Sequence, residues 1–80
     1  MAASYMKEIV TKRADELNIE LLNSDKDTIF HLNRSLDREE MDFIDAMTEL
    51  RKKFGSKFTE ADYKYMGNEI HRKLYNKPYF

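Results

Sequence analysis

Apolar residues recur at helical spacing along most of the chain, most clearly between residues 36 and 55. Steps of three and four place one set of apolar side chains on a single helix face: Met41, Ile44, Met47, Leu50 and Phe54. Asp37 is placed to cap this helix, Glu40 to complete a capping box, and Leu36 to form a hydrophobic staple with Met41. With Gly55 as its stop, the pattern predicts a helix of about five turns, roughly 25 Å long.

Two shorter helices are predicted before this central helix. Ser4 can cap the first one, whose apolar stripe consists of Met6, Ile9, Val10, Ala14 and Leu17. Asn18 predicts a left-handed stop with Ile19 folded back on the last turn, although residues 19–22 could prolong the helix to Asn23. A turn and new cap at residues 23–25 then predict a second helix of about two to three turns that ends before Ser35, with Ile29, Phe30 and Leu32 as its apolar residues.

The last predicted helix has clear signals at both ends. Thr59 caps it, Asp62 occupies the third helical position, and Phe58 with Tyr63 can form a second staple. Asn76 and Pro78 stop it. Its buried stripe is predicted to be Tyr63, Met66, Ile70 and Leu74, with Gly67 on the same face, where a glycine allows the central helix to approach closely.

These elements predict an all-α fold, a compact array of about four short helices in a single domain over residues 1–80. A four-residue turn joins the two strongest helices, so a helical hairpin at residues 37–75 is expected to be the main unit. The predicted second helix is too short for a long parallel bundle, which favours an orthogonal arrangement.

The composition limits which kinds of functional site the chain can form. The chain has 80 residues and no cysteine, which excludes disulfides and thiolate metal sites. It has neither a signal-peptide-like start nor an apolar run of membrane-spanning length, so a cytoplasmic protein is expected. The net charge of −1 divides unevenly: residues 1–50 carry 6 basic and 12 acidic side chains, and residues 51–80 carry 8 and 3. Such an asymmetry fits attraction between the two halves of the chain or a basic surface for an anionic partner.

No set of residues predicts catalysis, a metal site or a cofactor site. The two histidines, His31 and His71, are expected to be surface or boundary imidazoles. Glu69 and His71 are two residues apart, so on a helix they point to different faces and cannot chelate one metal ion. The exposed carboxylates of the central helix, Asp42 and Asp45, should both stay ionised. We therefore predict that the protein is not an enzyme.

The charged faces predict a non-enzymatic helical module for protein–protein interaction, a small regulator or adaptor that docks on another protein. Glu39 and three further carboxylates form an acidic stripe on the central helix, next to a basic cluster at its end. Such opposed faces suit electrostatically steered docking and could also pair in a homodimer. The candidate partner-binding residues are Asp42, Asp45, Glu49, Arg51, Lys52 and Lys53.

An alternative is a nucleic-acid-binding protein that uses the basic C-terminal third, residues 51–77. The candidate contacts are Arg51, Lys53, Lys57, Arg72, Lys73 and Lys77, with Tyr65 or Tyr75 available to stack on bases. Glu60 and Asp62 in the first turn of the last helix argue against a helix-turn-helix motif, because phosphate would repel them. Residues 78–80 either cover the core or offer an exposed aromatic contact.

Overall fold

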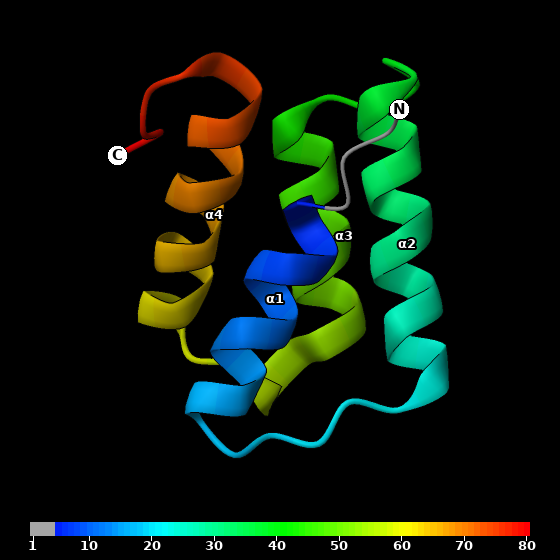
Figure 1. Ribbon diagram of the computed structural model, residues 1–80, viewed down its shortest axis with the longest axis vertical. Coiled ribbons are helices and arrows are strands. Elements are labelled where there is room, and N and C mark those ends of the chain that lie inside the picture. The colour runs from blue at the N-terminus through cyan, green and yellow to red at the C-terminus, as the bar shows by residue number, and fades with distance from the viewer. Residues whose placement is uncertain (1–4) are drawn as a thin grey trace.

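The computed structural model describes residues 5–80, and within this range the regular structure is helical, without strands (Figure 1). The predicted all-α fold is confirmed. Ser4, the predicted first cap, lies outside the described residues. The elements are α1 (Tyr5–Glu16), α2 (Asn23–Asp37), α3 (Phe43–Phe54), the short 3-10 helix η1 (Gly55–Lys57) and α4 (Glu60–Tyr75).

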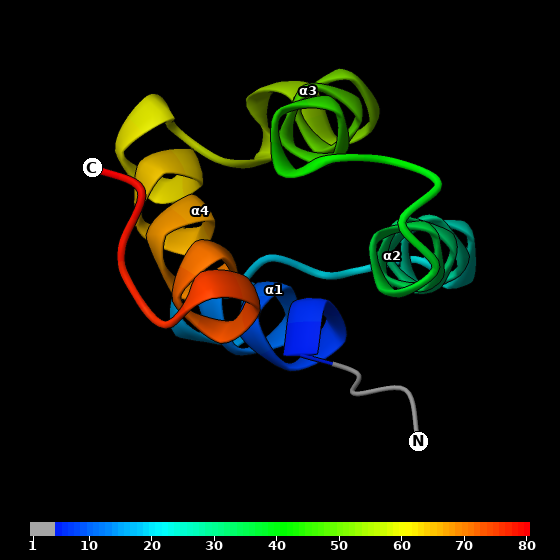
Figure 2. The same cartoon turned by 90° about the horizontal axis from the view of Figure 1, so that it is seen from above.

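The four helices run alternately down and up, and each packs against two others (Figure 1). Within the described range, α1 contacts α2 and α4, α3 contacts α2 and α4, and the diagonal pairs do not meet. Seen from above, α2 and α3 lie nearly end-on while α4 is tilted (Figure 2). The expectation of an orthogonal array is wrong because α2 has 15 residues and therefore spans the bundle.

One hydrophobic core fills the space between the helices. The stripes predicted on the first and last helices point into it, except that Leu17 is exposed and Ile9 and Leu74 are partly buried at the edge. The predicted staple residues Phe58 and Tyr63 are both buried, with their ring centroids 5.7 Å apart. The buried core residues are Tyr5, Met6, Val10, Ala14, Ile29, Leu32, Leu36, Phe43, Ala46, Met47, Leu50, Phe54, Phe58, Tyr63, Met66 and Ile70.

The predicted start of the central helix at Asp37 is wrong. Asp37 is the last residue of α2, and its carboxylate accepts hydrogen bonds from the Tyr5 hydroxyl and the Asn33 side-chain amide. Glu39 adopts a left-handed conformation with φ of 59°, and the Glu40 N–H donates to the Ser35 carbonyl, which closes the end of α2. Residues 36–40 therefore end one helix and do not begin the next.

The central helix α3 starts later, with Asp42 as its cap. The Asp42 side chain accepts from the Asp45 N–H at 2.8 Å. This start changes the predicted apolar face, because Phe43 is buried and Ile44 is 50% exposed. The predicted hairpin is formed by α3, η1 and α4, and its helix–helix interface is the smallest of the four.

Several helix ends are confirmed as predicted. Asn18 has a φ of 56°, and the Ile19 N–H donates back to the Ala14 carbonyl, so residues 19–22 do not prolong α1. Gly55 ends α3 with a φ of 53°, and Asn76 ends α4 with a φ of 60°. Thr59 caps α4 as predicted, and with Asp62 at the third helical position it forms a reciprocal capping box.

Gly67 lies on the face of α4 that meets α3, as predicted. A Cβ atom built there would lie 3.4 Å from the Met47 Cε atom and 3.6 Å from the Phe43 ring. The close neighbours are therefore side chains of α3, whereas the sequence suggested its backbone. The missing side chain leaves room between the two helices.

Candidate protein-docking groove

A groove lies between α3 and α4, on the side of the bundle where the helix–helix interface is smallest. One wall comes from α3, the floor and second wall come from α4, and the last two residues of the sequence add a third wall. Its volume is about 320 Å³. The lining residues are Phe43, Ile44, Met47, Thr48, Arg51, Tyr63, Gly67, Tyr79 and Phe80. The groove is therefore apolar and aromatic, with Arg51 as the one charged side chain among these residues.

Residues 77–80, which we call the tail, fold back along α4 (Figures 1 and 2). The Tyr79 ring packs 5.0 Å from the Phe43 ring and 5.3 Å from the His71 ring. The Phe80 ring lies 5.6 Å from the Lys64 ammonium nitrogen. Both tail rings nevertheless stay open to solvent, Tyr79 at 46% and Phe80 at 64% exposure. The tail thus covers part of the α3–α4 face without joining the core.

Two side chains of α4 hold the backbone of the tail. The Phe80 N–H donates to the Asn68 Oδ1 atom at 2.8 Å. The His71 Nδ1 atom lies 2.6 Å from the Lys77 carbonyl oxygen, and since a carbonyl only accepts, this ring nitrogen donates. His71 is half-buried, between the rings of Phe43 and Tyr75, so it is a boundary imidazole as predicted. His31, on α2, is exposed.

The predicted partner-binding residues are all on α3 or its cap, but they surround different surfaces. Arg51 lines the groove, where its guanidinium lies 5.3 Å from the Tyr63 ring centroid and is ion-paired with Glu60. This ion pair lowers the pKa of the Glu60 carboxyl. Lys52 and Lys53 are exposed on the outer surface, and Lys52 lies 3.8 Å from Glu49.

The acidic members of the predicted set lie on the side of α3 away from the groove floor. Asp45 is exposed and Glu49 is partly exposed. Asp42 lines a neighbouring hollow together with His71 and Lys77, and this hollow shares Phe43, Ile44 and Tyr79 with the groove. The acidic stripe thus reaches the surroundings of the groove through Asp42 alone.

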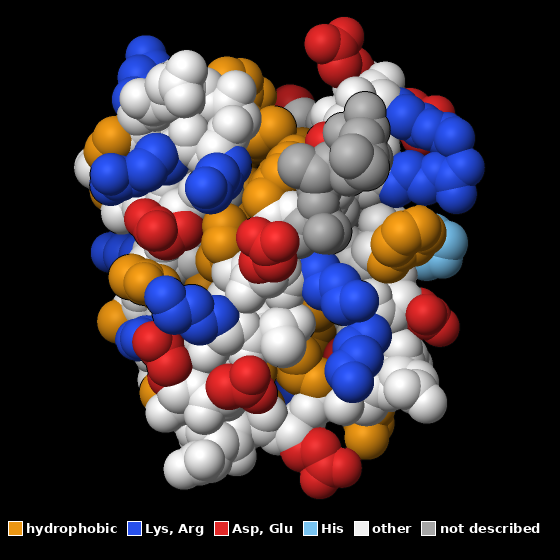
Figure 3. All heavy atoms as spheres, in the orientation of Figure 1, with side chains coloured by type: hydrophobic (Ala, Val, Ile, Leu, Met, Phe, Trp, Pro, Cys, Tyr) orange, Lys and Arg blue, Asp and Glu red, His pale blue; other side chains and the backbone are white. Residues whose placement is uncertain are grey.

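The basic residues proposed for nucleic-acid binding do not form one surface. Lys53 and Lys57 lie at the end of the bundle where α3 ends, whereas Arg72, Lys73 and Lys77 lie at the opposite end, where α4 ends (Figure 1). Lys57 forms an ion pair with Asp25 at 2.7 Å, which lowers the pKa of that carboxyl. On the face shown in Figure 3, basic and acidic side chains alternate. Tyr65, one of the two candidate stacking residues, is 42% exposed and has the Arg13 guanidinium 4.8 Å from its ring centroid.

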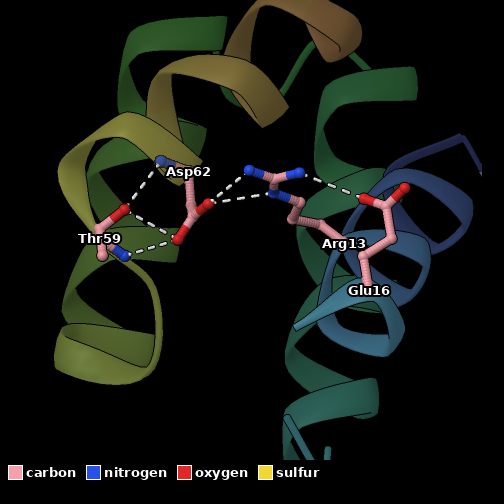
Figure 4. Close-up of polar contacts among 4 residues, drawn as sticks. All are labelled: Arg13, Glu16, Thr59 and Asp62. Atoms are coloured by element: carbon pink, nitrogen blue, oxygen red, sulfur yellow. Dashed lines mark hydrogen bonds and ion pairs between the residues drawn. The ribbon is translucent and has the colours of Figure 1, made fainter. Parts of the chain in front are cut away.

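The side of α4 away from the groove is fixed to α1 by a charged contact (Figure 4). The Asp62 Oδ1 atom accepts two hydrogen bonds from Arg13, at 2.8 and 3.0 Å. Its Oδ2 atom accepts from the backbone N–H and the hydroxyl of Thr59. Hydrogen bonds from Thr59, first from its backbone and then from its hydroxyl, and those from Arg13 lower the pKa of the Asp62 carboxyl. The cap of α4 is thereby bound to α1.

The start of α1 is held by α2 in a similar way. The buried Asn33 Oδ1 atom accepts the Met6 N–H at 2.9 Å, one of the first-turn donors that an α-helix cannot satisfy itself. Asp37 in turn holds both Asn33 and the hydroxyl of Tyr5, whose pKa is raised by burial and then by the nearby carboxylate. Sequence reasoning missed both long-range contacts, and it missed the groove itself. Gly67 is the one feature of the sequence that could have indicated the groove.

The comparisons identify no relative: no known protein family matches the chain, and no curated protein or solved structure is significantly similar to it. Among residues 5–80, no cluster of three or more histidine or acidic side chains is arranged to hold a metal ion. None of the helices in this range combines the length and the apolar character needed to cross a bilayer.

Proposed function

We propose that this protein is a non-enzymatic helical interaction module, a small regulator or adaptor that binds another protein through the α3–α4 groove. The observation that carries the proposal is the half-exposed Ile44 beside a groove lined with aromatic rings. An apolar side chain in such a position gains free energy when a partner covers it. Arg51 within the groove adds one charge that can orient the partner.

The charged residues of α3 and its cap contribute to this proposal in two ways, by direct contact and by steering the encounter. Arg51 within the groove and Asp42 in the adjoining hollow would contact the partner directly. Asp45, Glu49, Lys52 and Lys53 are placed on the outer surface of α3, where they would steer the encounter and would contribute less to affinity. Homodimerisation through these opposed charges stays a prediction, as does binding of nucleic acid by the two separate basic clusters.

The test is affinity capture from the native host with the tag fused ahead of Met1, away from the tail. Wild-type protein, Ile44→Glu and Phe30→Glu are used as baits after nuclease treatment. Phe30 is the matched control because it is also apolar and exposed, at 55%, but lies on α2. We expect one protein to be retained in stoichiometric amount by wild type and by Phe30→Glu, and to be lost with Ile44→Glu.

Two outcomes would contradict the proposal. Equal retention by all three baits would mean that the groove is not the contact. Recovery that collapses with nuclease in every sample would favour nucleic acid as the ligand, and Lys53→Glu and Arg72→Glu should then each weaken binding and flatten its salt dependence. Circular dichroism of each variant excludes unfolding as the cause of a loss.

A further inference from the structure

We propose that the tail is a displaceable cover of the α3–α4 face and that the partner replaces it with an extended, basic segment carrying two adjacent aromatic residues. This inference rests on the proposed function of the groove and adds the chemistry of its partner. The tail is the starting point because it already shows which kind of segment this face accepts. Its backbone and its rings are held by different groups, so each can be considered separately.

Asn68 and His71 are a pair of backbone-binding side chains, three residues apart on α4. Asn68 accepts a backbone N–H, from Phe80, and His71 donates to a backbone carbonyl, that of Lys77. Neither contact depends on the side chain of the residue bound. In a helix, backbone groups are already paired internally, whereas an extended segment leaves them available. The pair therefore fits an extended segment better than a helical one.

The rings of the tail indicate the side chains that such a segment carries. Tyr79 packs against Phe43 and His71, and Phe80 lies against the Lys64 ammonium group. Edge and tilted ring contacts at these distances are favourable for aromatic side chains. Two adjacent aromatic residues therefore fill the positions that this face offers.

The charges around the tail indicate that the segment carries a basic residue ahead of the two rings. Lys77 lines the same hollow as Asp42. The adjoining hollow beside α4 is lined by Asp42 together with Glu39, Glu40 and Asp45. A cation in the position of Lys77 is therefore attracted to this end of α3. Since both tail rings are about half exposed, the tail is held by little buried area, and a partner segment that buries more can replace it.

The first experiment uses the full chain and defined peptides as probes. The peptide acetyl-Asn-Lys-Pro-Tyr-Phe-amide copies residues 76–80, and its affinity is measured from the NMR shifts of the Ile44 and Gly67 amides. The protein is wild type or the double variant Tyr79→Ala with Phe80→Ala, and Phe30→Ala is the matched control. We expect the double variant to bind the peptide at least about fivefold more tightly than wild type and Phe30→Ala, because its tail no longer competes.

The second experiment tests the two recognition elements. N-methylation of the phenylalanine in the peptide removes the N–H that Asn68 accepts, and it should weaken binding by about fivefold or more. N-methylation of the tyrosine is the control and should have little effect. A peptide with glutamate in place of the lysine should bind more weakly, and this difference should shrink at high salt.

Each contrary result has a distinct meaning. Equal affinity of wild type and the double variant would overturn the displaceable tail, and indifference to N-methylation would overturn the extended segment. A wild-type dimer that dissociates in the double variant, seen by sedimentation, would make the tail of a second copy the occupant and would also overturn the proposal. If no peptide binds while Ile44→Glu still abolishes capture, the groove binds a protein of different chemistry, and only this further inference fails.

Discussion

The interfaces of α1 differ from the α3–α4 interface in how they are held together. Hydrogen bonds between helices fix α1 to α2 through Asn33 and to α4 through Arg13 and Asp62. The α3–α4 side has polar contacts only near the connecting turn, from Arg51 to Glu60 and from the Tyr63 hydroxyl to the Gly55 carbonyl. Burial raises the pKa of this Tyr63 hydroxyl. Away from this turn, the interface is held by side chains such as Phe43 and Met47, and the groove extends along it as far as Arg51.

The largest expected effect is a difference in stability between two isoleucine variants, one in the core and one at the groove. Ile29 is 0% exposed in α2, so Ile29→Ala should lower the free energy of unfolding by about 3 kcal/mol. Ile44→Ala at the groove should lower it by less than about 0.5 kcal/mol. Urea unfolding followed by circular dichroism measures both values. Similar losses for the two variants would mean that the groove side is packed as tightly as the core.

The next effect concerns the polar contact between α1 and α2. Asn33→Ala removes the acceptor of the Met6 N–H and leaves this buried donor unpaired, which should destabilise the protein by about 2 kcal/mol. Arg34→Ala, on the exposed side of the same helix, is the control and should change stability by less than about 0.5 kcal/mol. The same urea titration measures the loss of stability in both variants. Equal losses would mean that the Asn33 contact gives no specific stabilisation.

A smaller effect, with the opposite sign, is expected on the groove side. Gly67→Ala adds a methyl group at ordinary contact distance from Met47, and alanine favours a helix interior over glycine by up to about 1 kcal/mol. The variant should therefore be more stable than wild type and should bind the groove peptide more weakly, because the methyl group fills the groove floor. Destabilisation would show that α3 and α4 are already in full contact at this point.

The smallest expected effect is on the pH dependence of stability, through the contact between α1 and Asp62. The pKa of the Asp62 carboxyl lies below its ordinary value of 3.8, so the folded protein favours the charged form more than the unfolded chain does. Its stabilising contribution is present above the ordinary value and is lost as the pH falls through the lower, folded value. Melting temperatures from pH 6 down to about pH 2 should therefore fall more steeply for wild type than for Asp62→Asn. Asp27→Asn, at an exposed position of α2, should follow wild type.

The sequence predicted best those features that depend on neighbouring residues. The Thr59 and Asp62 capping box, the left-handed Asn18 and Asn76, and the stop at Gly55 are all set by local backbone chemistry. These signals need no knowledge of the tertiary structure. They correctly located both ends of α4 and the end of α3.

The errors arose where distant residues decide the structure. Aspartate is a common helix cap, but the Asp37 carboxylate accepts a hydrogen bond from Tyr5 of α1, and α2 continues to Asp37. This displaced start also shifted the apolar face of α3, so that Ile44 was assigned to the core in place of Phe43. The sequence did not predict the groove, because the groove depends on how the tail folds over α4. The spacing of apolar residues gives no information about that fold.

The contact between Asn33 and Met6 also has a consequence for the order in which the chain acquires structure during synthesis. The acceptor for the first turn of α1 lies 27 residues further along the chain, and α1 has only 12 residues. A helix of this length is marginal by itself in water. On the ribosome, α1 therefore leaves the exit tunnel before Asn33 does, and this contact of its first turn forms only after most of α2 has been made.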